Sequence, residues 1–225
     1  ILGDCLEEMD KLIVDGVKVN AIITDPPYNI SKENNYSTMN RTGIDFGNWD
    51  KNFDLFSWMD KGYKLLDKNG CMFIFNAWKN IGDIAKYAEG LGMETKDCFR
   101  WEKLNPMPRN RDRRYIVDFE MGVWLVNKKS KWTFNRQDEK FERPKFVSGL
   151  VSGKEKTKHP TQKPISLMEH LVKIHTNKND LVLDCFMGSG STAVACKHLD
   201  RNFIGIEKDE KHFKIAEDRI NSILL

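Results

Sequence analysis

The chain has 225 residues, 40% of them apolar and 15 of them glycine, which is close to the composition of ordinary globular proteins and excludes collagen, coiled coils and disordered chains. No apolar run approaches the roughly 20 residues that span a bilayer, and no leader-like segment opens the chain, so we expect a soluble protein that is not secreted. The net charge is only +3, yet residues 100–163 hold 17 Lys and Arg against 8 Asp and Glu; this local excess is typical of a surface that binds a polyanion, with an ordinary solvated surface as the alternative.

The first half of the chain predicts alternating strands and helices. Residues 19–24 form a β-branched apolar run that ends at two prolines, which indicates a buried strand. Residues 29–52 are polar and rich in Asn, Ser, Thr and Gly, so we expect a long functional loop. Apolar spacing then predicts helices over 53–67 and 81–91 and strands over 71–75, 94–102 and 120–127.

The second half begins with an arginine-dense loop at 105–115 that contains two prolines. Residues 128–158 have weak periodicity and mixed polarity, and we interpret them as a short insert. The remaining residues predict helices over 165–175, 191–199 and 210–224 and strands over 181–186 and 202–207. Alternation of this kind predicts a mostly parallel α/β sheet with helices on both faces.

A glycine-rich turn joins the strand that ends at Asp184 to the following helix, through Gly188 and Gly190. Glycines let the backbone approach a ligand closely, and the N-terminus of a helix offers unpaired N–H groups. Glu207, at the tip of the next strand, is placed to accept both hydroxyls of a ribose. These features predict a cofactor that contains a nucleoside. The same string also fits a dinucleotide fingerprint, so an NAD enzyme and a merely tight turn are alternatives.

A second motif, Asp25-Pro26-Pro27-Tyr28, stands at the end of the first predicted strand, where open α/β sheets bind their ligands. The two prolines fix the backbone, so the acid and the aromatic ring on either side are held in a set relation. A stiffened strand exit with a surface tyrosine is the alternative. The glycine-rich turn elsewhere in the chain makes that alternative much weaker.

Together, and in this order, the two motifs and the string His159-Pro-Thr-Gln-Lys-Pro164 resemble the amino-methylating DNA methyltransferases, in detail the β-group N6-adenine enzymes of bacterial restriction-modification systems. The resemblance covers nearly the whole chain. It implies a circularly permuted, Rossmann-like fold of the S-adenosylmethionine-dependent methyltransferases, with a sheet of the seven-stranded type. Residues 1–127 would form the catalytic half, 128–158 a small target-recognition insert and 159–225 the cofactor-binding half.

The resemblance also implies which residues bind S-adenosylmethionine. They are Asp4, Cys5, Asp25, His159, Thr161, Lys163, Asp184, Phe186, Gly188, Ser189, Gly190, Ser191, Thr192 and Glu207. Asp4 is the weakest match, because only Ile1 and Leu2 precede the Gly3-Asp4 pair where the family has a strand. Either this strand is truncated or the acid is held less rigidly. Because the chain starts at Ile1 and not at Met, we expect that further residues precede it.

The implied catalytic residues are Asp25, Pro26, Pro27 and Tyr28. The Asp25 carboxylate and the Pro26 carbonyl can each accept an N–H of an exocyclic amine, which directs the nitrogen lone pair at the methyl donor. The target base must leave the duplex, and Tyr28 offers a ring on which it can stack. DNA contacts are expected from Arg109, Arg111, Arg113 and Arg114, with solvated surface arginines as the alternative.

Other reactive residue types point to no further chemistry. The five cysteines form no CxxC pair, which indicates neither disulfides nor a zinc cluster and favours a reducing cytoplasm. We expect no metal, an ordinary role for Cys185, and core or surface roles for His170, His175, His198 and His212.

Three alternatives to an adenine-specific enzyme stay open. An N4-cytosine enzyme solves the same chemical problem, although such enzymes more often carry Ser where Asp25 stands. An NAD-dependent oxidoreductase would leave Asp25–Tyr28 and the basic segment unexplained, and a DNA-binding protein without activity is disfavoured by the intact motif. Besides DNA, the resemblance allows a homodimer and a cognate restriction endonuclease as partners, and it implies no membrane partner.

Overall fold

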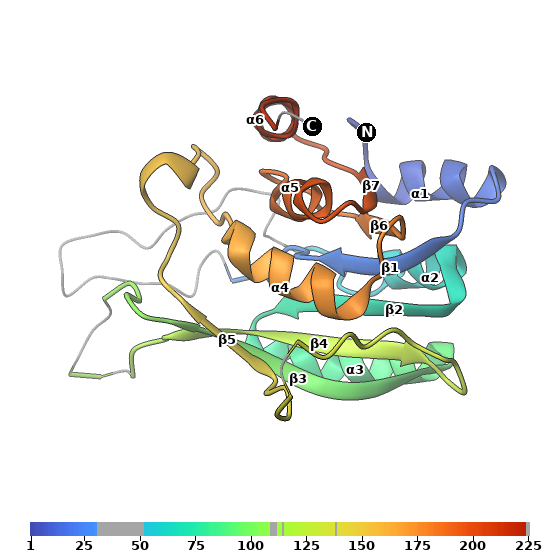
Figure 1. The fold of residues 1–225 in the computed structure, drawn as a ribbon, viewed down its shortest axis with the longest axis horizontal. Coiled ribbons are helices and arrows are strands. Elements are labelled where there is room, and N and C mark those ends of the chain that lie inside the picture. Colours follow the sequence, from blue (N-terminus) through green and yellow to red (C-terminus); the bar gives the residue numbers. More distant parts are fainter. Residues whose placement is uncertain (31–51, 109–111, 114, 138, 224–225) are drawn as a thin grey trace.

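The computed structural model describes residues 1–30, 52–108, 112–113, 115–137 and 139–223. Within these residues, seven strands form one sheet in the order β5–β3–β4–β2–β1–β6–β7 (Figure 1). The strands are β1 Val19–Thr24, β2 Leu66–Asn76, β3 Met93–Lys103, β4 Phe119–Asn127, β5 Lys145–Ser148, β6 Leu181–Asp184 and β7 Asn202–Gly205. Only β4 runs against its neighbours, β2 and β3, and every other pairing is parallel. The predicted mostly parallel sheet is confirmed.

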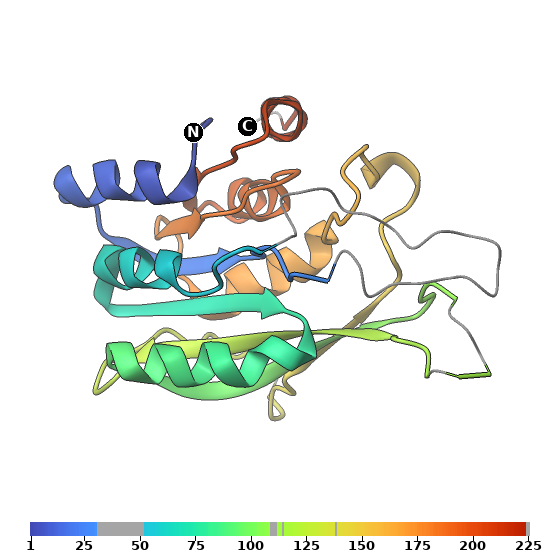
Figure 2. The same cartoon turned by 180° about the vertical axis from the view of Figure 1, so that it is seen from behind.

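Helices cover both faces of this sheet (Figures 1 and 2). They are α1 Cys5–Val14, α2 Ser57–Leu65, α3 Trp78–Leu91, α4 Ile165–His175, α5 Ser191–His198 and α6 Glu210–Asn221. One apolar core lies between the sheet and α1, α2 and α3, and a second lies between the sheet and α4 and α5. Strand β1 serves both, because Ile22 points into the first core while Ala21 and Ile23 point into the second. Five of its six residues are buried, which is typical of a strand covered on both faces.

The predicted boundary between the first long helix and the second strand is wrong. Helix α2 ends at Leu65, and Leu66 already belongs to β2. Val19 pairs with Leu66 and Ala21 pairs with Cys71. A single residue of β1 therefore stands opposite residues 67–70 of β2, and the pairing of the two strands is irregular there. The Asn-Gly pair at 69–70 lies within this irregularity and does not end a helix.

Helix α1 was not predicted, although its sequence carries the signals. The side chain of Asp4 accepts a hydrogen bond from the Leu6 N–H at 3.0 Å and so caps the first turn. Met9 is fully buried on the inner face, and acidic Glu7 and Glu8 occupy the first turn, where the helix dipole favours them. Residues 1–3 lie beside β7: Leu2 bridges Glu207, and the Gly3 N–H donates to the Glu207 carbonyl at 2.9 Å.

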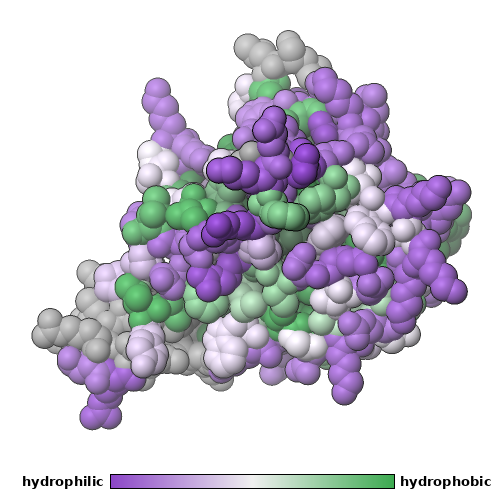
Figure 3. Space-filling model, turned by 60° about the horizontal axis from the view of Figure 1, so that its bottom comes forward, coloured by the Kyte–Doolittle hydropathy of each residue, from purple (hydrophilic) through white to green (hydrophobic). Residues whose placement is uncertain are grey.

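Part of the segment predicted as an insert belongs to the sheet. Strand β5 pairs with β3 at the edge, and the Trp101 indole N–H donates to Ser148 Oγ at 2.8 Å. On the side of the molecule that carries this edge, hydrophilic side chains predominate and apolar ones lie between them (Figure 3). No helix in the described part of the chain is long and apolar enough to cross a membrane.

Candidate active site

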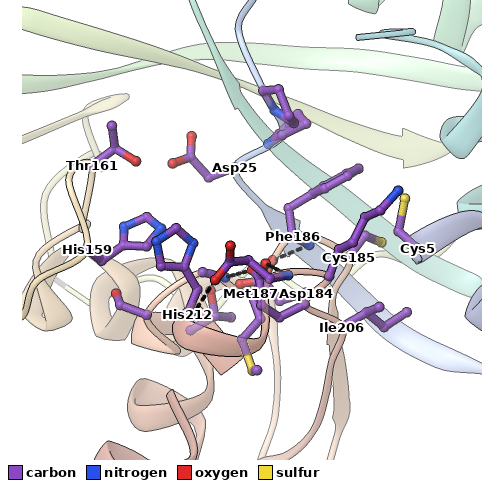
Figure 4. Close-up of a pocket in the computed structure, with 18 of the residues that line it drawn as sticks. Cys5, Asp25, His159, Thr161, Asp184, Cys185, Phe186, Met187, Ile206 and His212 are labelled. Atoms are coloured by element: carbon purple, nitrogen blue, oxygen red, sulfur yellow. Dashed lines mark hydrogen bonds between the residues drawn. The ribbon is translucent and has the colours of Figure 1, made fainter. Parts of the chain in front are cut away.

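A cavity of about 550 Å³ opens where β1, β6 and β7 end. Nearly all the predicted catalytic and cofactor residues line it: Asp4, Cys5, Asp25, Pro26, Pro27, Tyr28, His159, Thr161, Lys163, Asp184, Phe186, Gly188, Ser189, Ser191, Thr192 and Glu207. Asp25 faces it from one side, while Asp184, Phe186 and Met187 approach from the glycine-rich turn (Figure 4). The two acids at the heart of the sequence prediction, Asp25 and Glu207, therefore share one cavity. Gly190 is the predicted cofactor residue that does not line it.

The glycine-rich turn is held by backbone groups. Gly188 adopts a φ of 52°, and a side chain there would bring a Cβ to 2.9 Å from Nε2 of His159. Its N–H donates to Glu207 Oε2 at 2.7 Å, while the Asp209 N–H donates to Oε1 at 2.8 Å. The Glu207 carboxylate is thus fixed at the cavity wall and keeps lone pairs for further donors.

Gly190 has a supporting role. Its φ is 78°, and a Cβ at this position would lie 3.0 Å from the Cβ of Ala216, so glycine allows α5 to pack closely on α6. Arg219 of α6 donates through one guanidinium nitrogen to the carbonyl of Ser189 at 2.6 Å and to the hydroxyl of Ser191 at 3.3 Å. These hydrogen bonds connect the turn to the C-terminal helix.

Asp184 joins the two central strands at their ends. The hydroxyl of Thr24, the last residue of β1, donates to Asp184 Oδ1 at 2.7 Å, and the Phe186 N–H donates to the same oxygen at 3.2 Å. Burial raises the pKa of the Asp184 carboxyl to about 6, although these hydrogen bonds oppose the shift. The carboxyl therefore fixes the entry to the turn.

Asp4 lines the cavity at the N-terminus of α1. Its second carboxylate oxygen accepts from Lys208 Nζ at 2.9 Å, and this hydrogen bond lowers the pKa of Asp4. The side chain therefore has a capping partner and an ion-pair partner, and it connects α1 to the segment that follows β7.

Charged side chains from three other segments gather around Asp25 of the Asp25–Tyr28 motif. Asp25 accepts hydrogen bonds from the Tyr28 hydroxyl through one oxygen and from Lys163 Nζ through the other. Lys163 Nζ also lies 3.0 Å from Oε2 of Glu120, and Lys103 Nζ lies 2.6 Å from Oε1 of the same carboxylate. Two carboxylates and two ammonium groups thus alternate through the cluster.

These neighbours shift the ionisation of the cluster in different directions. Burial raises the pKa of Asp25, with Lys163 opposing the shift. Burial would also raise the pKa of Glu120, but Lys163 and Lys103 lower it to about 2. Burial disfavours the Lys163 ammonium, yet Asp25 and Glu120 raise its pKa. At neutral pH Lys163 and Glu120 are both charged.

The loop that carries Lys163 is anchored at several points. The Gln162 amide accepts from Thr157 N at 2.9 Å and donates to the Glu155 carbonyl at 2.8 Å, and Glu155 Oε1 accepts from the Ile165 N–H at the start of α4. The hydroxyl of Ser191 donates to the Lys163 carbonyl at 2.8 Å, which ties the loop to α5. The sequence places Lys163 with the cofactor, whereas the structure puts its ammonium group on Asp25.

Aromatic residues form an apolar wall of the cavity. Phe186 meets Phe53 and Trp58 edge-on, each at a centroid distance of 5.4 Å. Asn29 Oδ1 accepts from the Phe53 N–H at 2.8 Å, and its Nδ2 donates to the Phe53 carbonyl at 2.9 Å. Asn29, with a φ of 59°, thus joins the two chain segments that flank residues 31–51.

The predicted DNA-binding arginines are placed only in part. Arg109, Arg111 and Arg114 lie outside the described residues. Arg113 is exposed between β3 and β4 and does not line the cavity. The predicted loop 29–52 also lies outside the described residues from 31 to 51.

The histidines and cysteines occupy mostly structural positions. His175 is buried with its ring 4.7 Å from that of Trp124, and burial lowers its pKa to about 3. Burial raises the pKa of the Cys185 thiol well above its usual range, so this thiol stays protonated near pH 7. Among the described residues, no group of three His, Cys, Asp or Glu side chains could hold a metal ion.

Sequence reasoning missed several residues of the cavity. His212 was expected in an ordinary helical role, but it lines the cavity and its ring lies 4.4 Å from that of His159. Glu120 and Phe53 were read only as members of predicted elements. The residues missed altogether as lining groups include Gly3, Phe53, Glu120, Gln162, Met168, Met187, Ile206, Lys208, Asp209 and His212. For Glu120 a signal existed, since an acid at the start of an apolar strand beside a basic loop calls for a partner.

The seven-stranded α/β sheet brings the glycine-rich turn, the Glu207 carboxylate and the acid that precedes two prolines to one cavity at its strand ends, and this fold is that of the Rossmann-like methyltransferases. Residues 19–218 match a family described as DNA methylase, and the chain belongs to that family.

Relatives agree with this assignment. The chain is 31% identical to Type II methyltransferase M.HinfI of Haemophilus influenzae, over 98% of this chain and 67% of that protein. It is 32% identical to Type II methyltransferase M2.LlaDCHI of Lactococcus lactis subsp. cremoris, over 90% of this chain and 82% of that protein.

Solved structures give the same result. The structure of an M1.HpyAVI–SAM complex is 45% identical, with a TM-score of 0.83 over 98% of this chain and 97% of that one. PvuII DNA methyltransferase, described as cytosine-N4-specific, shares the fold, with a TM-score of 0.75, 18% identity and coverage of 100% of this chain and 87% of that one.

Proposed function

We propose that the protein transfers the methyl group of S-adenosylmethionine to the exocyclic N6 of an adenine that is flipped out of DNA, in a restriction-modification system. The observation that carries this proposal is that Asp25 and Glu207 line the same cavity. It supports a role for Asp25 as the acceptor of the amine protons and a role for Glu207 as the acceptor of the ribose hydroxyls. The choice of adenine rests on Asp25 itself, because the cytosine-N4 enzymes of the family more often carry Ser there.

The residues that line the cavity fit this cofactor. Glu207 presents a fixed carboxylate for the ribose hydroxyls, and Gly188 leaves open the space next to its backbone. Phe186 and Phe53 provide an apolar surface suited to a purine. Buried Nδ1 of His159 has no hydrogen-bond partner among the described residues, so this nitrogen is available for a polar ligand group.

Asp25 acts on the amine of the base. An exocyclic amine is conjugated with its ring and poorly nucleophilic, so acceptors must draw its N–H groups away as the new bond forms. The Asp25 carboxylate and the Pro26 carbonyl serve as these acceptors, and Asp25 takes the proton that the methylated nitrogen releases. S-adenosylmethionine, held by the Glu207 side of the cavity, would supply the methyl group as a sulfonium and would keep the electrons of the broken carbon–sulfur bond on sulfur.

Tyr28 and the basic segment bring the base to this position. The Tyr28 hydroxyl is held by Asp25, which fixes the ring beside the carboxylate. Stacking on such a ring contributes about 1–3 kcal/mol, comparable with the cost of unstacking a base. Phosphate contacts from Arg109, Arg111, Arg113 and Arg114 supply the remainder, and residues 128–158 contribute to target recognition as a short insert between the catalytic and cofactor halves.

The experiment is transfer of labelled methyl from S-adenosylmethionine to plasmid DNA, followed by digestion to nucleosides and mass spectrometry. The proposal expects N6-methyldeoxyadenosine in a fixed sequence context. Detection of N4-methyldeoxycytidine would show that the protein is a cytosine-N4 methyltransferase. Binding of DNA without transfer of the label would contradict the proposal. A titration with NAD serves as the control for the oxidoreductase alternative, and we expect no binding.

The cellular setting follows from this function. We propose that the protein acts in the cytoplasm on the DNA that a cognate restriction endonuclease would otherwise cut, and that a homodimer can supply contacts which the short insert lacks. Plasmid DNA modified by the protein should resist that nuclease. Sedimentation with and without DNA measures the oligomeric state.

A further inference from the structure

Glu120 contacts the catalytic motif although neither the motif nor the cofactor segment contains it. It lies at the start of β4, on the strand next to β2 and two strands away from β1, which leads into Asp25. Oε2 of Glu120 lies 3.0 Å from Lys163 Nζ, and Oε1 lies 2.6 Å from Lys103 Nζ. The side chain of Lys163 is only 6% exposed, so its ammonium group depends on these carboxylates for its counter-charge.

The geometry makes Lys163 a shared partner. Its ammonium group donates to Asp25 and lies against Glu120, and it is 3.3 Å from the Tyr28 hydroxyl. A carboxylate that must accept a proton needs enough basicity to do so. A lysine bound to Asp25 alone would stabilise the negative charge and weaken that basicity, whereas a lysine shared with a second carboxylate does so less.

We propose that Glu120 is a positioning residue for methyl transfer: it holds Lys163 between two carboxylates and thereby sets both the orientation of Asp25 and the positive charge that Asp25 experiences. The proposal rests on the proposed function, because it assigns Asp25 the proton of the amine. It gives Lys163 a part at the catalytic end of the cavity. Lys103 holds the other oxygen of Glu120 and fixes its direction.

The charged groups that face Asp25 come from several elements. Lys163 lies in the loop before α4, Glu120 lies on β4, Tyr28 is the last residue of the motif, and Asp184 ends β6. Lys163 lowers the pKa of Asp25, whereas Glu120 raises it. Removing the charge of Glu120 must therefore lower the pKa of Asp25, and removing the charge of Lys163 must raise it. A purely structural role predicts no such opposite signs.

The test measures the single-turnover rate of methyl transfer as a function of pH for wild type, Glu120→Gln, Lys163→Met and Glu102→Gln. Glu102 is the matched control: it pairs with Arg100 and Lys145 on neighbouring β3 and β5 and does not line the cavity. For Glu120→Gln we expect the acidic limb of the pH–rate profile to move to lower pH by about 1 unit, because the pKa of Asp25 falls. The rate at neutral pH should fall about tenfold, because Asp25 is then less basic and less well oriented. For Lys163→Met the acidic limb should move to higher pH, and Glu102→Gln should follow wild type.

Three further readouts keep the result decisive. Cofactor affinity should be the same in Glu120→Gln and wild type, and thermal unfolding reports whether each variant folds. If Glu120→Gln does not fold, the pH–rate profile of Lys163→Met is compared with that of the Glu120→Gln/Lys163→Met double variant. The acidic limb of the double variant should lie at lower pH than that of Lys163→Met. Carbon-13 NMR of aspartate-labelled protein, assigned with Asp25→Asn, follows the Asp25 carboxyl without cofactor or DNA.

The outcomes separate this inference from the function it rests on. If wild type transfers no methyl group to DNA, the proposed function fails, and the NMR titration alone decides whether Glu120 controls Asp25. If wild type is active but the Glu120→Gln profile overlies those of wild type and Glu102→Gln, the role of Glu120 is overturned. A shift of the acidic limb to higher pH in Glu120→Gln would overturn it as well.

Discussion

The two ends of the cavity are built by different means. At the Glu207 end, where we propose that the cofactor binds, backbone groups of one short segment do most of the positioning: the hydrogen bond from the Gly188 N–H to Glu207 spans 19 positions of the sequence. At the Asp25 end, where we propose that methyl transfer takes place, charged side chains from distant elements converge, and the contact between Lys163 and Asp25 spans 138 positions. The first end is a local motif, whereas the second depends on the whole sheet.

This difference implies that mutations can impair methyl transfer and cofactor binding separately. Asp25→Ala should abolish methyl transfer, with a loss of at least about 1000-fold, because the acceptor of the amine proton is gone. Cofactor binding should stay within about threefold of wild type, because the Gly188–Glu207 end is untouched. Single-turnover transfer and a cofactor titration on the same sample measure both, and persistent turnover would refute the role of Asp25.

Asp184 lies between the two ends of the cavity, and its ionisation makes the stability of this region depend on pH. Its folded-state pKa of about 6 exceeds the value of 3.8 for an exposed aspartate, so the native state holds a proton that the unfolded state releases. Its contribution to the free energy of unfolding is therefore complete below about pH 4 and lost as pH rises through 6, a change of about 3 kcal/mol.

Asp184→Asn lacks this titration. The difference in unfolding free energy between wild type and Asp184→Asn should therefore fall by about 3 kcal/mol from pH 4 to pH 7. Urea denaturation at these pH values measures it, and Asp15→Asn, an exposed change at the end of α1, is the control. A difference that does not change with pH would show that Asp184 titrates normally.

Glu207→Ala tests the cofactor end alone. The loss of a carboxylate that accepts ribose hydroxyls should weaken cofactor binding about tenfold to 100-fold, and the choice of base should not change. Isothermal titration gives the affinity, with Glu210→Ala on the exposed start of α6 as the control. Equal affinities of Glu207→Ala and wild type would show that Glu207 does not bind the ribose.

The smallest effect is expected from the basic loop. Neutralising Arg111 and Arg113 together should lower the slope of log affinity for DNA against log salt by about 2, because two phosphate contacts are lost. Fluorescence anisotropy at several salt concentrations measures the slope. An unchanged slope would assign DNA binding to another face of the protein.

The local motifs were predictable, because each carries its own physical signal. Asp25 follows an apolar run and precedes two prolines, and Gly188 and Gly190 follow another strand, so their placement at the ends of neighbouring strands follows from the topology of open sheets. The sheet itself follows from the alternation of strand and helix patterns. These signals lie within a few residues of one another, and no tertiary information is needed to read them.

The remaining features depended on contacts between distant residues. An acid such as Glu120 at the start of an apolar strand signals that it needs a partner, but nothing near it in the sequence identifies that partner as Lys163. Strand β5 is too short and too polar to be predicted from its own residues. Lys163 was assigned to the cofactor because its motif suggests it, while the fold turns its ammonium group to Asp25. Helix α1 is different, since Asp4 and the acidic first turn were readable signals that went unused.

The central claim is that the Asp25 carboxylate accepts a hydrogen bond from the amine of a flipped base. The cofactor is bound on the opposite side of that amine by the C-terminal third of the chain. The most direct measurement is a crystal structure with cognate DNA and a non-reactive analogue of the cofactor. We expect the amine nitrogen within about 3.2 Å of the Asp25 carboxylate, with the Glu207 carboxylate bound to the ribose hydroxyls. A base bound elsewhere, with the Asp25–Lys163 pair closed to it, would contradict the account.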